Sequence, residues 1–265
     1  MTQFRHLAAL GSSFASGPGI EPLENRVAQR STRNYPHLLA EQFGAALTDL
    51  TVSGATTNTV LDQPQHFLSR RFPPQLSALP SDADLVTITI GGNDLNYSAS
   101  TIRFGLAGRC AMRPLTRPLA AMLARGGVPQ PSCSDVERVA SNLARIVRAV
   151  RRRTDNARIV LVDYLTVIGP NVEQRRPTPF DRDTADQLRR LGDNVAGAFS
   201  RAAALSGAEL VAVSALSRDH AAGSPQPWVS PLPDKLGHSF RSVPYHPNAA
   251  GMRATANAVL EHLAR

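Results

Sequence analysis

Three short apolar runs near the start of the chain each lead into a glycine and a small polar residue. The runs and the turns that follow them are Leu7–Leu10 with Gly11-Ser12-Ser13, Leu47–Val52 with Ser53-Gly54, and Ala83–Ile90 with Gly91-Gly92-Asn93. The third run is nearly continuous and rich in β-branched residues, which is typical of a strand covered on both faces. Strands of a parallel sheet present the residues that follow them at one shared edge, where open α/β sheets bind ligands. We therefore expect these three turns to form a ligand site.

Strand and helix patterns alternate along the rest of the chain. Further strands are predicted at Arg158–Tyr164 and Glu209–Val213, and helices at Tyr35–Phe43, Thr57–Leu61, Thr184–Leu205, from the capping box Ser134–Glu137 onward, and from Pro247-Asn248 to Leu263. This alternation predicts an α/β fold, with a five-stranded parallel sheet between two helix layers in a single domain over residues 1–265. Residues 95–133 and 214–245 lack a clear period and are expected to be irregular excursions beside the site.

The charge of the chain restricts its partners. The chain has 29 Lys and Arg against 21 Asp and Glu, a net charge of +8 over 265 residues. The basic residues are scattered and match no nucleic-acid-binding motif, so we expect no nucleic-acid partner. The positive charge weakly favours association with anionic lipid surfaces. The apolar runs are too short to span a bilayer, and we expect a monomer without cofactor or metal.

Two cysteines bear on the compartment. Cys110 and Cys133 flank a segment rich in Pro, Gly and Arg, where a disulfide would hold a loose excursion together. A disulfide would favour an exported protein, whereas the lack of a leader before the first strand favours the cytoplasm. Both alternatives stay open: a cytoplasmic protein as the sequence stands, or a secreted one if this is a mature or trimmed form.

Four residues supply what acyl transfer from an ester needs. Ser13 offers a nucleophile, and His246, just before the last helix, offers a base. The backbone N–H groups of Ser13 and Gly54 and the side-chain amide of Asn93 offer donors to an oxyanion. Each residue alone is an ordinary turn, cap or helix-start residue. Their occurrence together at predicted strand ends favours a catalytic site.

The same residues carry a resemblance to a known family. The stretches Leu10–Gly17, Ser53–Ala55, Gly91–Asp94 and His246–Met252 are similar, in this order, to the four conserved blocks of SGNH (GDSL-type) hydrolases. The resemblance places Ser13, Gly54, Asn93 and His246 at the positions that name the family. It implies a three-layer, flavodoxin-like fold and hydrolysis of esters or thioesters without a metal.

Two positions depart from the family pattern. The family usually has Asp where Ser12 stands, and we expect the Ser12 hydroxyl to cap the following turn instead. Many members carry a catalytic Asp three residues before the histidine, where this chain has Val243. The backbone carbonyl of Val243 is expected to accept the Nδ1–H of His246, a Ser–His dyad that resembles some actinobacterial members. The alternative partners are the carboxylates of Asp234 and Asp219.

These features predict a serine esterase or lipase. Ser13 would form an acyl-enzyme, His246 would act as general base, and Ser13, Gly54 and Asn93 would form the oxyanion hole. Phe14, Leu95 and Tyr97 are candidates for the acyl pocket of a small-molecule or lipid ester. Two alternatives stay open: an acyltransferase that uses the same site, and a catalytically silent protein that binds lipid or glycan.

Overall fold

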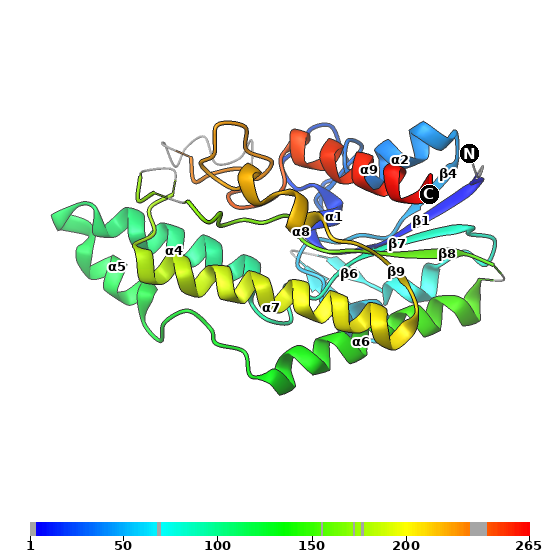
Figure 1. Cartoon of the computed structure of the whole chain (residues 1–265), viewed down its shortest axis with the longest axis horizontal. Coiled ribbons are helices and arrows are strands. Elements are labelled where there is room, and N and C mark those ends of the chain that lie inside the picture. The colour runs from blue at the N-terminus through cyan, green and yellow to red at the C-terminus, as the bar shows by residue number, and fades with distance from the viewer. Residues whose placement is uncertain (1–3, 68–69, 155, 172, 176–177, 234–242) are drawn as a thin grey trace.

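A parallel sheet lies at the centre of the computed structural model, which describes residues 4–67, 70–154, 156–171, 173–175, 178–233 and 243–265 (Figure 1). Its strands are β1 (His6–Gly11), β4 (Ala46–Asp49), β7 (Leu85–Thr89), β8 (Arg158–Val162) and β9 (Glu209–Val211). They lie in the order β4-β1-β7-β8-β9, and all four pairings are parallel. The five expected strands are confirmed. The direction of winding reverses between β1 and β7, which is where open α/β sheets place their ligand sites.

Helices cover both faces of this sheet, as predicted. Figure 1 shows α2 (Tyr35–Phe43) and α9 (Ala249–Leu263) on one side, and α3 (Thr57–Leu61), α6 (Cys133–Arg153) and α7 (Arg182–Ser206) on the other. Both faces of the central strand are covered, because every residue of β7 is buried, Thr87 and Thr89 included. Within the described part of the chain, every helix is too short or too polar to traverse a bilayer.

Helix α6 shows how the sequence pattern becomes structure. Its apolar side chains recur at helical spacing and are buried, and arginines line its solvent face. The helix begins earlier than predicted, because Ser132 and not Ser134 is the N-cap. The Asp135 carboxylate accepts a hydrogen bond of 3.0 Å from the Ser132 N–H, and the Ser132 hydroxyl accepts one of 3.2 Å from the Asp135 N–H. The capping box in the structure, Ser132 with Asp135, begins two residues before the predicted one, Ser134 with Glu137.

Residues 97–124 are largely helical, which corrects the irregular excursion expected over residues 95–133. They contain α4 (Tyr97–Ala111), a 3₁₀ turn η2 (Pro114–Thr116) and α5 (Arg117–Ala124), which form a hairpin. Small residues at the packing positions of α4 hide its helical period; at Gly108, a Cβ atom would lie 1.7 Å from the Pro179 carbonyl oxygen. In the other excursion, the described residues 214–233 hold only the end of α8 (Val213–Leu216) and the turn η3 (Arg218–His220). The remainder, 234–242, lies outside the described residues.

The candidate disulfide is absent, because Cys110 and Cys133 are both free. Cys110 lies in the last turn of α4, and Cys133 is the first residue of α6. Helix α4 packs on α5, and α6 packs on α7. The segment between the cysteines is thus held by helix packing and does not require a covalent link.

Short elements complete the fold. Two hairpins, β2–β3 and β5–β6, and three single turns lie among the connections. Their bounds are β2 (Leu23–Asn25), β3 (Arg30–Ser31), β5 (Gln65–Phe67), β6 (Arg70–Phe72), α1 (Ser13–Ser16), α8 as above and the 3₁₀ turn η1 (Gln75–Ala78). The sequence prediction did not include the hairpins, since their strands are too short to show a period of two.

The end of β1 is fixed by the side chain of Gln75. Its Oε1 accepts a hydrogen bond of 2.8 Å from the Gly11 N–H, and its Nε2 donates one of 2.9 Å to the Gly11 carbonyl. Gln75 therefore replaces a strand partner at the residue where the sheet ends. Gly11 has to be glycine here, because a Cβ atom would lie 2.8 Å from the Thr89 carbonyl oxygen.

Replacing this side chain by Gln75→Ala should destabilise the protein. It leaves the buried N–H of Gly11 without a partner, at about 1–3 kcal/mol, while the Gly11 carbonyl keeps a hydrogen bond of 3.1 Å from the Val52 N–H. Urea unfolding followed by circular dichroism measures the loss. Gln63→Ala, at an exposed glutamine, is the control and should change stability by less than about 0.5 kcal/mol. Equal effects of the two substitutions would contradict the assignment.

Candidate active site

Ser13 lies at the turn between β1 and α1, at the carboxyl edge of the sheet. It is the first residue of α1 and is 5% exposed. The Ser12 N–H extends the sheet by donating to the Thr89 carbonyl at 3.0 Å. The Ser13 hydroxyl points to the imidazole of His246, with Oγ 2.9 Å from Nε2. Residues 233 positions apart in the chain are thus in direct contact, as the sequence predicted.

His246 is held by the segment around the only tryptophan of the chain. The Ser230 N–H donates to the His246 carbonyl at 2.9 Å, and Val229 forms a bridge with Pro247. The next turn is closed by Asn248, whose side chain caps α9 by accepting from the Gly251 N–H at 2.9 Å. These contacts fix the backbone on both sides of His246 and so the position from which its side chain extends.

The Nδ1 atom of His246 lies 2.9 Å from the carbonyl oxygen of Pro244, not that of Val243. The acceptor therefore lies one residue later in the chain than expected, and the backbone conformation of Tyr245 explains the difference. Tyr245 has a left-handed φ of 58°, so the chain turns sharply and brings the Pro244 carbonyl back to the ring. Asp219 lies on η3 and is not the partner of this nitrogen. Asp234 lies outside the described residues.

The Pro244 carbonyl decides which nitrogen of His246 carries the proton. A carbonyl oxygen only accepts hydrogen bonds, so Nδ1 must be the donor. Nε2 of the neutral ring is then free to accept the proton of the Ser13 hydroxyl. Burial lowers the pKa of His246 from 6.5 to about 4, although the hydrogen bond to Pro244 acts in the opposite direction. The imidazole is therefore neutral at physiological pH, the form that a general base needs.

Three N–H donors lie at the strand ends around Ser13. Among the described residues, the backbone N–H groups of Ser13 and Gly54 have no acceptor within the protein. The Asn93 side chain donates one N–H to the Ala55 carbonyl at 2.8 Å, which leaves its second N–H unused. Unused donors at the carboxyl edge of a sheet are what an oxyanion requires.

The loops that carry Gly54 and Asn93 are tied to each other. Besides the contact of Asn93 with Ala55, the Asp94 carboxylate accepts hydrogen bonds from the Thr57 N–H at 3.0 Å and the Thr57 hydroxyl at 2.5 Å. Burial raises the pKa of Asp94, and the bonds from Thr57 act against this increase. Asp94 thereby caps α3 and joins the two loops. Asp94 lies in the family-like stretch Gly91–Asp94, but the sequence predicted no role for it.

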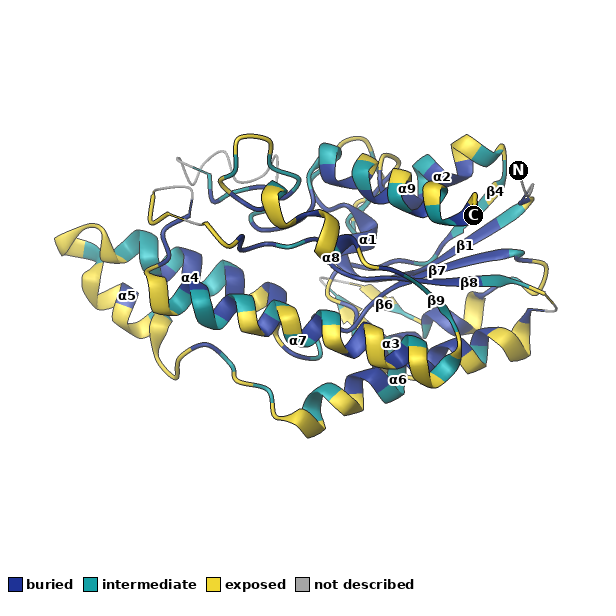
Figure 2. Cartoon of the chain, in the orientation of Figure 1, coloured by how far each residue is buried: buried dark blue, intermediate teal, exposed yellow. Residues whose placement is uncertain are grey.

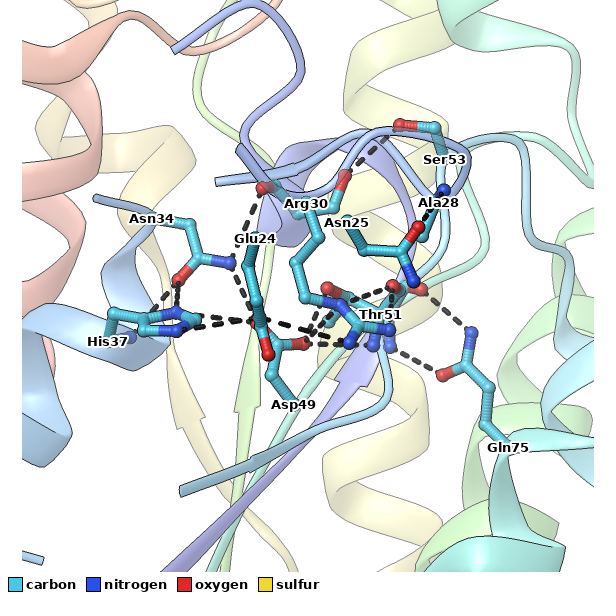
Figure 3. Close-up of polar contacts among 12 residues, drawn as sticks. Glu24, Asn25, Ala28, Arg30, Asn34, His37, Asp49, Thr51, Ser53 and Gln75 are labelled. Atoms are coloured by element: carbon cyan, nitrogen blue, oxygen red, sulfur yellow. Dashed lines mark hydrogen bonds and ion pairs between the residues drawn. The ribbon is translucent and has the colours of Figure 1, made fainter. Parts of the chain in front are cut away.

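A network of polar side chains braces the turn at Ser53 (Figure 3). The Ser53 N–H donates to the Ala28 carbonyl at 3.0 Å, and its own carbonyl accepts from Gln65 Nε2 at 2.7 Å. Its hydroxyl lies 3.1 Å from the hydroxyl of Ser16 in α1. Gly54 follows directly with a left-handed φ of 79°. The network therefore fixes the turn that carries Gly54 and joins it to α1, the helix that begins at Ser13.

One cluster in this network has side chains of the metal-binding type. Glu24, His37 and Asp49 lie with their ligand atoms within 4.8 Å of one another. Arg30 occupies the same space, with Nε 3.4 Å from Asp49 Oδ1 (Figure 3). The other Asp49 oxygen accepts from Asn34 Nδ2 at 2.8 Å. The Arg30 guanidinium already supplies the positive charge, so we assign the cluster a structural role.

Tyr164 connects the first and third strand ends, which the sequence analysis missed. Its hydroxyl lies 2.9 Å from Ser12 Oγ and accepts a hydrogen bond of 3.1 Å from the Gly92 N–H. Burial raises the pKa of Tyr164 to about 12, so the phenol stays protonated. Ser12 therefore contacts Tyr164, and its side chain does not cap α1 as expected. Tyr164 is the last residue of the predicted strand Arg158–Tyr164, and this place at a strand end was the sign in the sequence that it could reach the site.

The three residues expected to form the acyl pocket belong to the core. Phe14, Leu95 and Tyr97 are 3–4% exposed. The Phe14 ring packs on Tyr164, with centroids 4.5 Å apart, and on His246 at 5.3 Å. Tyr97 lines a cavity of about 280 Å³ behind Tyr164, and neither Ser13 nor His246 lines it. Phe14 thus packs against the catalytic imidazole, whereas Leu95 and Tyr97 are part of the hydrophobic core.

Comparison with known proteins agrees with this geometry. The model of the GDSL-like Lipase/Acylhydrolase family matches residues 9–254. Lipase 2 of Streptomyces coelicolor is 32% identical over 96% of this chain and 84% of its own length. Lipase 1 of the same organism is 25% identical over 92% of this chain and 81% of its own length.

Solved structures show the same fold. Phospholipase A1 from Streptomyces albidoflavus superposes with a TM-score of 0.74 at 22% identity, covering 98% of this chain and 99% of that one. The extracellular lipase of Streptomyces rimosus gives a TM-score of 0.70 at 23% identity, covering 97% and 99%. The extent of the family match, together with the convergence of its four sequence blocks at one sheet edge, shows that this chain belongs to the GDSL-like lipase/acylhydrolase family of ester hydrolases.

Proposed function

We propose that this protein is a serine esterase that cleaves carboxylic esters through an acyl-enzyme on Ser13. The observation that carries the proposal is the 2.9 Å contact between Ser13 Oγ and Nε2 of a neutral, buried His246. A nucleophile within hydrogen-bond reach of an oriented base is the common signature of covalent acyl transfer.

The first half of the reaction forms the acyl-enzyme. Nε2 of His246 takes the proton of the Ser13 hydroxyl as Oγ attacks the ester carbonyl carbon. The carbonyl oxygen becomes an oxyanion and accepts hydrogen bonds from the Ser13 N–H, the Gly54 N–H and the Asn93 side chain. The intermediate collapses, the C–O bond breaks, and the alcohol leaves with the proton from His246.

The second half repeats these steps with water. His246 accepts a proton from water, whose oxygen attacks the acyl carbon, and Ser13 leaves as the free hydroxyl with the proton returned. The Pro244 carbonyl stabilises the transient imidazolium through the Nδ1–H. A neutral carbonyl stabilises this cation less than a carboxylate does, but it fixes the same orientation and tautomer.

Lipid esters are the substrate class that we propose. Support comes from Lipase 2, the relative with 32% identity over most of both chains, and from the phospholipase A1 with the same fold. Because an acyltransferase would use the same residues, competing acceptor alcohols in the assay distinguish transfer from hydrolysis. A silent binding protein would fail to react with a fluorophosphonate probe.

Turnover of a p-nitrophenyl ester tests the nucleophile and base directly. Ser13→Ala and His246→Ala should each lower kcat by roughly 10⁴- to 10⁶-fold, because both act in one chemical unit. Circular dichroism melting should show that both variants remain folded. A Ser13→Ala variant with the turnover of the wild type would refute the proposal.

The pH profile should reflect the buried imidazole. Protonated His246 cannot accept the Ser13 proton, so activity falls as pH drops through the pKa of this group. Burial lowers that pKa from 6.5 to about 4, and kcat/KM, which reports the free enzyme, should therefore stay level through pH 6.5 and decline only near pH 4. The far-ultraviolet circular dichroism signal, followed over the same range, separates titration from acid unfolding. An acid limb at or above pH 6.5 would contradict the assignment.

Asn93→Ala should lower kcat by roughly 10²- to 10³-fold and change KM little, since an oxyanion forms only after attack. Asn58→Ala, at an exposed asparagine of α3, is the control and should keep the wild-type kcat. Steady-state kinetics with a soluble ester measures both. A loss below about threefold for Asn93→Ala would exclude this side chain from the oxyanion hole.

A further inference from the structure

The hairpin formed by α4 and α5 concentrates exposed apolar side chains. Four of the six large hydrophobic residues that are exposed among the described residues lie between positions 112 and 122. They are Met112 at 41%, Leu115 at 96%, Leu119 at 44% and Met122 at 64% exposure. We refer to these four residues, together with Arg113, Arg117 and Arg125, as the hairpin patch. Scattered apolar residues are normal on a surface, whereas a cluster of this kind is typical of an interaction site.

The four side chains form an exposed apolar stripe that runs from the turn of the hairpin into its second helix. Met112 is the C-cap of α4, Leu115 lies in η2, and Leu119 and Met122 lie three residues apart in α5, on one side of that helix. The apolar side of an ordinary surface helix faces the core. Here Ala120 is the buried residue of α5, and most of this helix, Leu119 and Met122 included, is exposed (Figure 2).

The hydrogen bonds that close the hairpin do not involve these four side chains. Arg103 of α4 donates through Nε to the Leu123 carbonyl at 2.6 Å and through its guanidinium to the Arg125 carbonyl at 2.5 Å. The Thr116 hydroxyl donates to the Cys110 carbonyl at 2.6 Å. Polar contacts and Ala120 therefore close the hairpin, and the apolar stripe has no evident packing role.

All charged side chains of the hairpin and of the residues that flank it in the sequence are positive. Residues 95–134 contain five arginines and neither aspartate nor glutamate. Arg113, Arg117 and Arg125 are exposed, and within the described part of the chain they form no ion pair. An apolar stripe flanked by free guanidinium groups complements a surface that offers phosphates above hydrocarbon, which is an anionic bilayer.

The hairpin is joined to both sides of the active site. Helix α4 begins four residues after Asn93, and it projects past the carboxyl end of the sheet (Figure 1). At Gly105, a Cβ atom would lie 2.5 Å from the Tyr245 ring, so the residue before His246 rests directly on this helix. Arg109 donates to the Pro233 carbonyl at 2.8 Å. Helix α4 therefore contacts the segment that carries His246 and connects it to the hairpin patch.

We propose that the hairpin patch docks the protein onto bilayers that contain anionic phospholipid. Met112, Leu115, Leu119 and Met122 enter the boundary between headgroups and acyl chains, and the three arginines contact lipid phosphates. The proposal rests on the proposed function in one respect, since it presents the Ser13 site to lipid esters. Docking itself requires no catalysis and is tested separately.

Sedimentation with vesicles of phosphatidylcholine and phosphatidylglycerol measures docking, in a Ser13→Ala background that leaves the lipid intact. The double variant Leu115→Ser/Met122→Ser should bind at least about tenfold more weakly, because it removes the largest exposed apolar area. Arg113→Gln/Arg117→Gln should also lose about tenfold on these vesicles. The residual binding of this arginine variant should equal the binding of the parent to vesicles of pure phosphatidylcholine. Added salt should weaken the binding of the parent to the anionic vesicles.

Matched controls lie elsewhere on the surface. Leu205→Ser/Leu216→Ser removes the other two exposed large hydrophobic side chains, and Arg190→Gln/Arg253→Gln removes two exposed arginines with the same loss of charge. Both controls should bind as the parent does. In the Ser13-containing protein, all four double variants should retain the wild-type turnover of a soluble ester.

Several outcomes would overturn the proposal. They are a parent that does not sediment with anionic vesicles, patch variants that bind as well as the parent, and controls that lose as much as the patch variants. Light scattering after gel filtration adds a fourth: a dimer that only the patch variants dissociate, with vesicle binding unchanged, would assign the patch to a second copy of this chain. Docking without ester turnover would instead refute the proposed function and leave the docking surface standing.

Discussion

The hydrogen bond from Nδ1 of His246 to the Pro244 carbonyl is the contact on which the site depends. It gives the imidazole one tautomer and one orientation, and both are needed before Nε2 can face Ser13. In a triad, a buried carboxylate would do this work and would also favour the charged ring. A neutral carbonyl favours the charged ring less than a carboxylate does, so burial dominates and keeps the ring neutral. The same choice of partner thus sets both the geometry and the acid–base behaviour of the site.

The three strand ends are fixed by side chains that take no part in the chemistry. Gln75 holds Gly11, Tyr164 bridges the first and third turns, and Asp94 binds the second turn to the third. Because these groups are buried or partly buried and hydrogen-bonded, little reorganisation is left for the moment of reaction. Preorganised donors of this kind are what makes an oxyanion hole effective.

The sequence predicted the sheet, the helices on both faces and the four residues that meet at its edge. These features follow from local patterns: apolar runs that end in glycine, and helices with a clear period. It did not predict the α4 helix, whose small residues at packing positions show no period. Nor did it identify Pro244 as the acceptor, because that depends on a single left-handed residue, Tyr245. The role of Tyr164 depends on a contact across 152 positions, which no local pattern records.

At Gly251 the last helix packs directly on the backbone of Trp228, which leaves no space for a side chain. A methyl group at this position would lie 2.2 Å from the Trp228 carbonyl oxygen, so the first turn of α9 touches the backbone that carries Val229 and Ser230. That backbone in turn holds the peptide of His246. If the C-terminal helix were exchanged between relatives by engineering, any change in how it packs would therefore displace the backbone of His246. Residue 251 should be kept as glycine in libraries of such chimeras.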